Sequence, residues 1–323
     1  MRAYEECTLC PRECRVNRYE RAGYCGGRER MRIARAGLHF WEEPCISGTK
    51  GSGAIFFVGC NMGCVFCQNH EISMGTTGRE ISRETGKEIS RGTNRKSGKE
   101  TGKETSPERL VEIFHELKDK GANNINLVTA DIYIPEIREA ISRARESGFD
   151  LPFILNTSSY IRMEALKSLE GLIDIYLPDF KYIRDRDAIR YSKAKGYPEA
   201  AMAAIDEMVR QQSGCIFEQT DDGMMLKKGV IVRHLLLPGM VIQAKLILKA
   251  LHDRYGDRIL CSLLSQYTPN GMTGGFPEID RRVKENEYKS LVRYAQRLGL
   301  EGYVQDMSSA DECYVPPFDL SGV

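Results

Sequence analysis

The sequence predicts an α/β protein: a partial or near-complete parallel β/α barrel of the TIM type, preceded by a cysteine-rich segment. Three observations point to this fold. From Ala54 onward short apolar segments alternate with amphipathic ones, polar residues follow most apolar segments, and cysteines concentrate near the N-terminus. Such alternation is typical of parallel strands buried on both faces and joined by helices. The 323 residues suffice for one such domain of roughly 250 residues plus a small appendage.

The predicted strands are short apolar segments that recur along the chain. They span residues 54–59, 124–129, 152–156, 172–177, 230–236, 259–264 and 302–305. In barrels of this type the active site lies at the carboxyl ends of the strands. The residues that directly follow each segment are therefore the first candidates for function.

The predicted helices lie between these strands and carry apolar residues at three- and four-residue steps. Leu110, Ile113, Phe114 and Leu117 show this spacing. Ser106, placed before a proline, is a typical start for the first helix. The predicted helices span residues 108–120, 135–147, 162–169, 199–212, 241–254 and 286–298.

The chain divides into a cysteine-rich segment, residues 1–48, and a barrel, residues 49–323. The barrel carries a low-complexity insert at 75–105, in which Gly-Lys-Glu and Gly-Arg-Glu units repeat and the only large apolar residues are Ile81 and Ile89. Such a segment buries too little apolar surface to offset its ordering entropy. We expect a solvated, inert insert, with contact to a partner through its Lys and Arg as the alternative.

The composition is that of a soluble globular protein, with 41% hydrophobic and 28% charged residues and a net charge of +1. It favours neither nucleic acid nor membrane as a partner. The N-terminus lacks the apolar core of a secretory signal, and no apolar run approaches the roughly 20 residues of a membrane span. We therefore expect a cytoplasmic protein, in which clustered cysteines indicate metal binding or catalysis rather than disulfides. The scattered Cys45, Cys215, Cys261 and Cys313 are expected to be small buried residues.

The most informative motif is Cys60-Asn-Met-Gly-Cys64-Val-Phe-Cys67, which follows the first predicted strand. Three thiolates hold three irons of a four-iron cluster and leave one iron open. A structural zinc site needs a fourth ligand, for which His70 is the nearby candidate, and incidental buried cysteines are the third interpretation. His70 itself either faces the cluster or lies on the surface.

A second set, Cys7, Cys10, Cys14 and Cys25, places four thiols within nineteen residues and without histidine. Such a small segment needs a metal to hold its shape. Zinc and an iron–sulfur cluster both fit the spacing. A structural metal is the favoured interpretation, and a second cluster that relays electrons is the alternative.

The Cys60–Cys67 loop closely resembles that of the radical S-adenosylmethionine (radical SAM) superfamily. Further stretches resemble the branch described as homologues of pyruvate formate-lyase activating enzyme. These stretches are residues 41–48, 67–69, 126–129, 156–158, 174–182, 232–239, 265–269 and 304–306. The resemblance implies a [4Fe-4S] cluster on Cys60, Cys64 and Cys67. Its open iron would bind S-adenosylmethionine, whose one-electron cleavage yields a 5′-deoxyadenosyl radical.

The resemblance also implies cofactor contacts after the second strand. Relatives carry a Gly-Gly-Glu segment there that contacts the methionine amino group, and members of the named branch tend toward Thr-Pro-Thr-His. This chain has Thr129-Ala130-Asp131 instead. Asp131 is a candidate acceptor for the amino group, with a helix cap before Pro135 as the alternative.

Polar residues after the later strands complete the candidate cofactor site. Asn156, Thr157 and Ser158 are candidate partners of the cofactor's ribose or carboxylate, with a polar turn as the alternative. Asp179 and Lys181 resemble an Asp-x-Lys pair near the cofactor of activating enzymes, with a solvated ion pair as the alternative.

Two further positions complete the sequence predictions. Arg233, within an apolar strand, requires a carboxylate partner, which is either the cofactor or a protein side chain. Gln266 and Tyr267 are candidates for the substrate mouth.

Three functions follow from these motifs. The first is an activating enzyme that installs a glycyl radical on a partner enzyme, with a flavodoxin or ferredoxin as electron donor. The second is a radical SAM enzyme that acts on a different protein, peptide or metabolite. The third is a non-catalytic iron–sulfur protein, against which the extended barrel and the open-iron motif argue.

Overall fold

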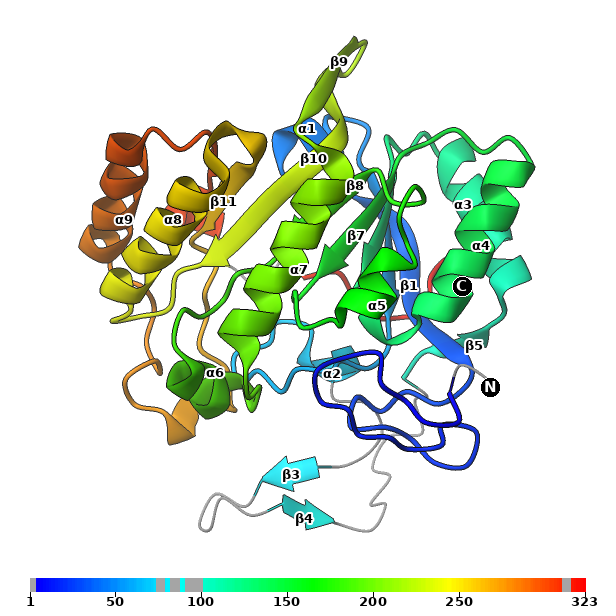
Figure 1. Cartoon of the computed structure of the whole chain (residues 1–323), viewed down its shortest axis with the longest axis horizontal. Coiled ribbons are helices and arrows are strands. Elements are labelled where there is room, and N and C mark those ends of the chain that lie inside the picture. The colour runs from blue at the N-terminus through cyan, green and yellow to red at the C-terminus, as the bar shows by residue number, and fades with distance from the viewer. Residues whose placement is uncertain (1–3, 74–78, 82–87, 91–100, 310–314) are drawn as a thin grey trace.

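The computed structural model describes residues 4–73, 79–81, 88–90, 101–309 and 315–323 (Figure 1). The strands are β1 (Met31–His39), β2 (Ser52–Phe57), β3 (Arg79–Ile81), β4 (Glu88–Ser90), β5 (Lys103–Thr105), β6 (Ile125–Val128), β7 (Phe153–Thr157), β8 (Ile175–Pro178), β9 (Ile216–Thr220), β10 (Gly223–Leu235), β11 (Leu260–Leu264) and β12 (Gly302–Val304). The α-helices are α1 (Pro44–Ser47), α2 (His70–Ser73), α3 (Pro107–Asp119), α4 (Ile134–Glu146), α5 (Met163–Lys167), α6 (Asp185–Ser192), α7 (Tyr197–Gln212), α8 (Val241–Tyr255) and α9 (Glu285–Leu298).

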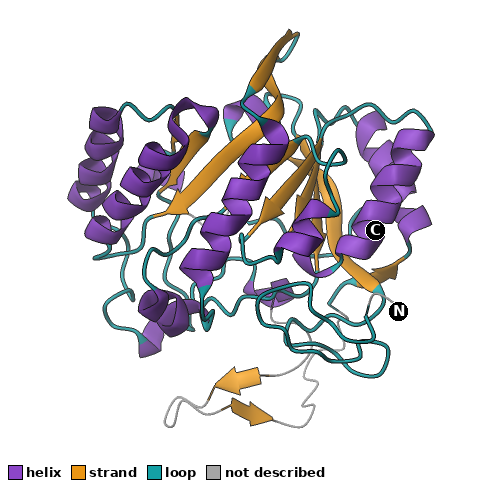
Figure 2. Ribbon diagram, viewed as in Figure 1, coloured by secondary structure: helices purple, strands orange, loops and turns teal. Residues whose placement is uncertain are grey.

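The main sheet has the strand order β12-β11-β10-β8-β7-β6-β2-β1-β5, and β9 pairs with β10 outside this path. Neighbours from β2 to β12 along this path are parallel, whereas β1 is antiparallel to both β2 and β5. The sheet runs from β12 at one edge to β5 at the other, as in a partial barrel. Figure 2 shows the longer helices outside the sheet and the parallel strands pointing toward one side of the molecule.

The predicted strands and helices are confirmed in type and order. Each predicted strand corresponds to one parallel strand, and α3, α4, α5, α7, α8 and α9 are the predicted helices. At the start of α3 the Ser106 side chain accepts a hydrogen bond from the Arg109 amide (3.3 Å), as its position before a proline indicated. None of the helices in the described residues combines the length and apolarity needed to cross a membrane.

The structure differs from the predicted boundaries at two places. Strand β1 lies inside the cysteine-rich segment but pairs with β2, and its Met31 and Ile33 are buried in the main core. The end of the predicted insert, Lys103–Thr105, is β5 and pairs with β1. Neither edge strand was predictable, because β1 contains Arg32 and Arg35 without a regular alternation and β5 is fully polar. Only tertiary pairing makes these segments strands. Most of the remaining insert lies outside the described residues.

The parallel strands have an outer and an inner face. Leu155, Tyr176 and Val232 lie on the outer face, in the large core shared with the helices. Their neighbours on the inner face include Ile154, Ile175, Leu177 and Ile231, which pack with Cys45 and Ile46 of α1. Because side chains alternate along a strand, residues two positions beyond these also project inward. This alternation places polar side chains inside the barrel near its carboxyl edge.

Candidate active site

The cysteines of the C-x3-C-x2-C motif lie on the loop that joins β2 to α2. Two other segments hold this loop through its backbone. The amide of Cys60 donates to the carbonyl of Cys25 (3.1 Å), and the amide of Gly63 donates to the carbonyl of Ser192 at the end of α6 (3.0 Å). The loop thus lies between the N-terminal segment and α6, on the side toward which the strands point (Figure 1).

The thiols of this loop lie in surroundings that disfavour the thiolate in the absence of a metal. Burial raises the pKa of Cys60 well above its usual value, that of Cys64 to about 11, and that of Cys67 as well. The Ser192 hydroxyl donates to the Cys64 sulfur (2.9 Å), and the Met62 amide donates to the Cys60 sulfur (3.4 Å). Because metals bind thiolates, occupation of this loop by a cluster would release protons.

A buried polar network runs along the inner face of the barrel. Asn156, Asp179 and Arg233 each lie two residues beyond an apolar inner-face residue. One Arg233 nitrogen donates to Glu42 (2.9 Å), and another donates to the Asn156 side-chain oxygen (2.5 Å). The Asn126 amide also donates to Glu42 (2.8 Å). The carboxylate partner that the sequence predicted for Arg233 is therefore Glu42.

The Asp179–Lys181 pair is in contact, as its spacing on an extended segment predicted. The Lys181 ammonium lies 2.6 Å from Asp179, and both side chains are about four-fifths buried, so this is not the solvated pair of the alternative interpretation. Burial alone would lower the pKa of Lys181, but Asp179 and Cys64 outweigh it and raise the pKa. The Tyr197 hydroxyl accepts from the Lys181 amide (2.9 Å) and donates toward the Asp179 carbonyl (2.9 Å). A charged ammonium is thereby fixed close to the cysteine loop.

Asp131 lies in the short 3-10 helix Ala130–Ile132 and is 1% exposed. Among the described residues, neither of its carboxylate oxygens has a hydrogen-bond partner of normal geometry. Burial raises the pKa of Asp131 to about 6, although the nearby Thr157 hydroxyl and Ser158 amide partly offset this effect. The helix cap proposed as its alternative role is not formed, because Tyr133 occupies the position before α4.

Thr129 and the turn after β7 surround this carboxylate. Thr129 adopts a left-handed conformation (φ +62°), and its amide donates to the Asn156 carbonyl (2.9 Å). The Thr157 hydroxyl accepts from the Ser159 amide (3.0 Å). The Ser158 hydroxyl lies 3.5 Å from the side-chain oxygen of Asn61 in the cysteine loop. The structure therefore gathers the predicted residues from three strand ends around the loop.

The four N-terminal cysteines line one small cavity, together with Asn61 of the cysteine loop and Asp131. Cys7 is buried, and Cys10, Cys14 and Cys25 are partly exposed. In the part of the chain that the structure describes, no three His, Cys, Asp or Glu side chains are placed to ligate a single metal ion.

Other predicted residues lie outside this arrangement. His70 is exposed at the start of α2, the surface position of the alternative interpretation. Tyr267 is buried, and its hydroxyl donates to the Ile279 carbonyl (2.6 Å). Tyr267 therefore holds the loop between β11 and α9 rather than lining a substrate mouth. The Gln266 carbonyl accepts from Gln68 of the cysteine loop (2.9 Å). Cys45 and Cys261 are buried and Cys215 is partly exposed, whereas Cys313 lies outside the described residues.

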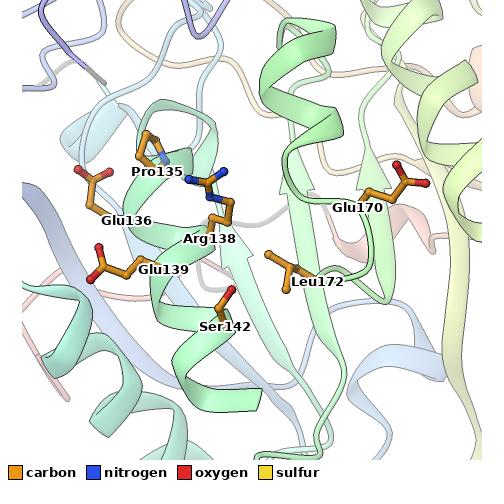
Figure 3. A pocket seen from close by; sticks show the side chains of 7 residues that line it. All are labelled: Pro135, Glu136, Arg138, Glu139, Ser142, Glu170 and Leu172. Atoms are coloured by element: carbon orange, nitrogen blue, oxygen red, sulfur yellow. The ribbon is translucent and has the colours of Figure 1, made fainter. Parts of the chain in front are cut away.

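An open surface hollow on α4 is unrelated to these residues. Figure 3 shows Ser142 on the side of α4 that faces Leu172 of the segment before β8, whereas Glu139 points away from Leu172. Its lining contains no cysteine and none of the inner-face residues. The arrangement at the carboxyl ends of the strands therefore remains the candidate site.

Comparison with known proteins decides the family. Residues 54–230, more than half of the chain, match the radical SAM superfamily. The chain belongs to the radical SAM superfamily. Membership implies an enzyme that uses a [4Fe-4S] cluster and S-adenosylmethionine for radical chemistry.

Individual relatives are distant. The uncharacterized protein MJ0674 of Methanocaldococcus jannaschii is 25% identical over 299 residues, which cover 92% of this chain and 76% of that protein. A domain of pyruvate-formate lyase-activating enzyme from Bacteroides vulgatus is 13% identical with a TM-score of 0.39, covering 54% of this chain and 92% of that domain. The FeFe-hydrogenase maturase HydG from Carboxydothermus hydrogenoformans is 14% identical with a TM-score of 0.49, covering 81% of this chain and 56% of HydG.

The described residues of this radical SAM protein fit its implied cofactors. Buried polar atoms without hydrogen-bond partners occur on Asp131, on Nε of Arg233 and on the side-chain oxygen of Asn126. Such atoms are costly unless a ligand satisfies them. S-adenosylmethionine supplies amino, carboxylate and hydroxyl groups that complement this set.

Sequence reasoning missed three residues of this radical SAM site: Glu42, Asn126 and Ser192. Glu42 and Asn126 lie in stretches that resemble the family, but only the fold shows that both project into the barrel. Ser192 ends α6, a helix absent from the predictions, and carried no sequence signal for its bond to Cys64.

Proposed function

We propose that Cys60, Cys64 and Cys67 hold the [4Fe-4S] cluster of this radical SAM enzyme, with S-adenosylmethionine bound in the barrel beside it. The observation that carries this proposal is the buried carboxylate of Asp131, which has no hydrogen-bond partner of normal geometry among the described residues and lines the same cavity as Asn61 of the cysteine loop. When bound, these cofactors supply a 5′-deoxyadenosyl radical that removes a hydrogen atom from a substrate.

The residues around the loop would bind and orient the sulfonium cofactor. Asp131 would accept a hydrogen bond from its amino group, and the cations Lys181 and Arg233 would pair with its carboxylate. Thr157 and Ser158 would contact its ribose hydroxyls. These assignments use groups that the fold already holds in place, which limits the entropic cost of binding.

Thr129 and Asn156 would position the cofactor-binding groups rather than contact the cofactor themselves. Asn156 accepts hydrogen bonds from both the Thr129 amide (2.9 Å) and the Arg233 guanidinium (2.5 Å), and thereby joins the two sides of the site. Tyr197 would hold the Asp179–Lys181 segment in place through its hydrogen bonds to the Lys181 amide and the Asp179 carbonyl, and its buried ring would help to exclude water.

For the substrate we propose a glycyl-radical enzyme, with a flavodoxin or ferredoxin as electron donor. The support is the resemblance of this chain's motifs to homologues of pyruvate formate-lyase activating enzyme. A test is anaerobic incubation of the reduced protein and S-adenosylmethionine with a glycyl-radical enzyme from the same genome, followed by paramagnetic resonance. A glycyl-radical doublet supports this substrate. Cofactor cleavage without a doublet favours another protein, peptide or metabolite.

The cofactor assignment has its own experiment. Anaerobically reconstituted protein, reduced with dithionite, should change its paramagnetic resonance spectrum on addition of S-adenosylmethionine and release 5′-deoxyadenosine. Cys64→Ala should lose both responses, whereas Cys261→Ala, a buried cysteine away from the loop, should keep them. A fully loaded cluster whose spectrum ignores the cofactor would contradict the assignment.

A further inference from the structure

The N-terminal segment brings its four cysteines to one small space. The Cys7 amide donates to the Val16 carbonyl and the Arg15 amide to the Cys7 carbonyl (both 3.1 Å), which folds this stretch back on itself. A second turn returns at Gly23, where an added Cβ would lie 3.5 Å from the Cys25 sulfur and 3.6 Å from the Cys14 sulfur. Those two sulfurs therefore border the same space, and all four cysteines line one cavity.

This cavity shares a wall with the loop that carries Cys60. The Cys60 amide donates to the Cys25 carbonyl (3.1 Å). Gly59 adopts φ +97°, and a Cβ at this position would lie 2.5 Å from the same carbonyl. Asn61 and Asp131 line the cavity as well. One ligand candidate from each cysteine set is thus in direct backbone contact with the other set.

Arg12 provides a second contact between the N-terminal segment and the cysteine loop. The Arg12 guanidinium lies 3.5 Å from the centre of the Tyr24 ring, and its Nε donates to the Asn61 carbonyl. Arginine stacked on an aromatic ring and bonded to a carbonyl is a rigid contact. The geometry between the two cysteine sets is therefore held by several independent contacts.

A buried cation lies beside the four thiols. Arg18 is fully buried, and its guanidinium donates to the Ile132 carbonyl (2.6 Å) and the Arg28 carbonyl (3.1 Å). Its guanidinium lies 3.9 Å from the centre of the Tyr4 ring, and an added Cβ at Gly27 would lie 2.8 Å from an Arg18 nitrogen and 3.3 Å from the Cys25 sulfur, so Arg18 and Cys25 border the same space. A buried charge is retained at low cost only beside an opposite charge. Thiolates bound to a metal centre provide that charge.

We propose that Cys7, Cys10, Cys14 and Cys25 hold a second [4Fe-4S] cluster, which passes single electrons to the Cys60 loop through the Cys25–Cys60 contact. This inference rests on the proposed function of that loop. Four cysteines complete the ligand set of such a cluster. Zinc has no redox chemistry and could not pass electrons to the Cys60 loop.

The electron balance is simple. A low-potential donor protein of the ferredoxin or flavodoxin class loses one electron, and the N-terminal cluster gains it. That cluster is reoxidised when the electron moves to the cluster of the Cys60 loop. The thiolate ligands make and break no bonds in this transfer, and no proton moves.

Metal content and spectroscopy test the site itself. Reconstituted protein should contain about eight irons and about eight sulfides per chain. Reduction should give two paramagnetic resonance signals, of which only one responds to S-adenosylmethionine. About four irons together with one zinc per chain would overturn the second cluster in favour of a structural zinc.

Reciprocal variants separate this inference from the proposed function. Cys10→Ser/Cys14→Ser should lose about half of the iron and the unresponsive signal. Cys60→Ala/Cys64→Ala/Cys67→Ala should lose the other half and keep the unresponsive signal. If the triple variant binds no iron, the N-terminal cluster is refuted. If the wild type shows two signals but neither responds to S-adenosylmethionine, the proposed function fails while the second site stands.

The relay is tested with the Cys10→Ser/Cys14→Ser variant and two reductants. Formation of 5′-deoxyadenosine with reduced flavodoxin should fall at least about tenfold, because each lost order of magnitude corresponds to about 1.4 kcal/mol of barrier. Formation with dithionite, a small reductant that reaches the Cys60 loop directly, should stay within about twofold of wild type, a difference of under about 0.5 kcal/mol. Equal rates with flavodoxin in variant and wild type would overturn the relay, and loss with both reductants would assign the segment a structural role instead.

Discussion

At the scale of single residues, the site consists of charged groups held away from water. Glu42 and Arg233 form an ion pair at 2.9 Å inside the barrel, with side chains only 10% and 12% exposed. Burial alone would lower the pKa of Arg233, but Glu42, Glu43 and Asp179 raise it above its ordinary value. A pair this buried contributes little net stability, and its retention is better explained by the ligand that it orients.

Asp131 offers a prediction at this scale. Its pKa is raised to about 6 by burial, so its carboxylate is charged above pH 6 and neutral below. Affinity for S-adenosylmethionine should therefore fall as pH drops below 6, because the neutral acid no longer pairs with the ammonium group. Asp131→Asn should weaken binding roughly 10–100-fold at pH 7.5, as expected for a lost charge-assisted hydrogen bond.

Calorimetric titration with the cofactor between pH 5 and pH 8 measures both effects. The control is the Asp131→Asn variant itself. Its affinity should lack the step near pH 6. A step of the same size in variant and wild type would assign the pH dependence to another group.

At the scale of elements, connections position the cysteine loop more than the strands do. Strand β2 supplies the start of the loop, but the Gly63 and Val65 amides donate to the carbonyls of Ser192 and Tyr191 in α6 (3.0 and 2.9 Å). The Asp179 segment pairs with Arg233 in a parallel bridge that extends the sheet by one residue. Site residues are therefore coupled through backbone contacts between loops.

Gly59 offers a prediction at this scale. Its positive φ and its contact with the Cys25 carbonyl leave no room for a Cβ, which would also lie 2.8 Å from Ile132. Gly59→Ala should lower the free energy of unfolding by about 2–5 kcal/mol, since backbone strain and overpacking add. It should also reduce bound iron, because the contact joins the two cysteine sets.

Gly121→Ala is the matched control. Gly121 also has a positive φ (+89°), but nothing lies within 4 Å of its added Cβ. Gly121→Ala should lower the free energy of unfolding only through backbone strain, by about 1–2 kcal/mol, and should keep the iron content of wild type. Urea unfolding and iron analysis distinguish the two variants, and equal losses in both would refute the role of the Gly59 contact.

At the scale of the whole molecule, distant segments complete the barrel edge. Strand β5 pairs with β1, and the chain end returns to the same place: the Leu320 amide donates to the Ala34 carbonyl (3.1 Å). Lys103 also donates to the Val323 carbonyl (3.0 Å). The last residues of the predicted insert thus belong to the main sheet as β5.

The insert offers a prediction at this scale. Replacement of residues 75–100 by a short Gly/Ser linker should change the free energy of unfolding by only about 1 kcal/mol, because loop closure depends weakly on length. Iron content should not change. A matched variant that also removes β5 should be clearly less stable, because Gly102 and β5 pack on the core. Urea unfolding compares the three proteins, and a large loss from the shorter replacement would show that the insert contributes to the fold.

By itself the sequence determined the order of parallel strands and helices, because apolar periodicity reports directly which faces are buried. It also determined the cysteine spacing and which polar residues end the strands. Only the tertiary structure decided that Glu42 pairs with Arg233, that β1 and β5 are strands, and that Cys25 touches Cys60. These contacts join residues far apart along the chain, and local sequence patterns cannot predict them because they report only the burial of neighbouring residues.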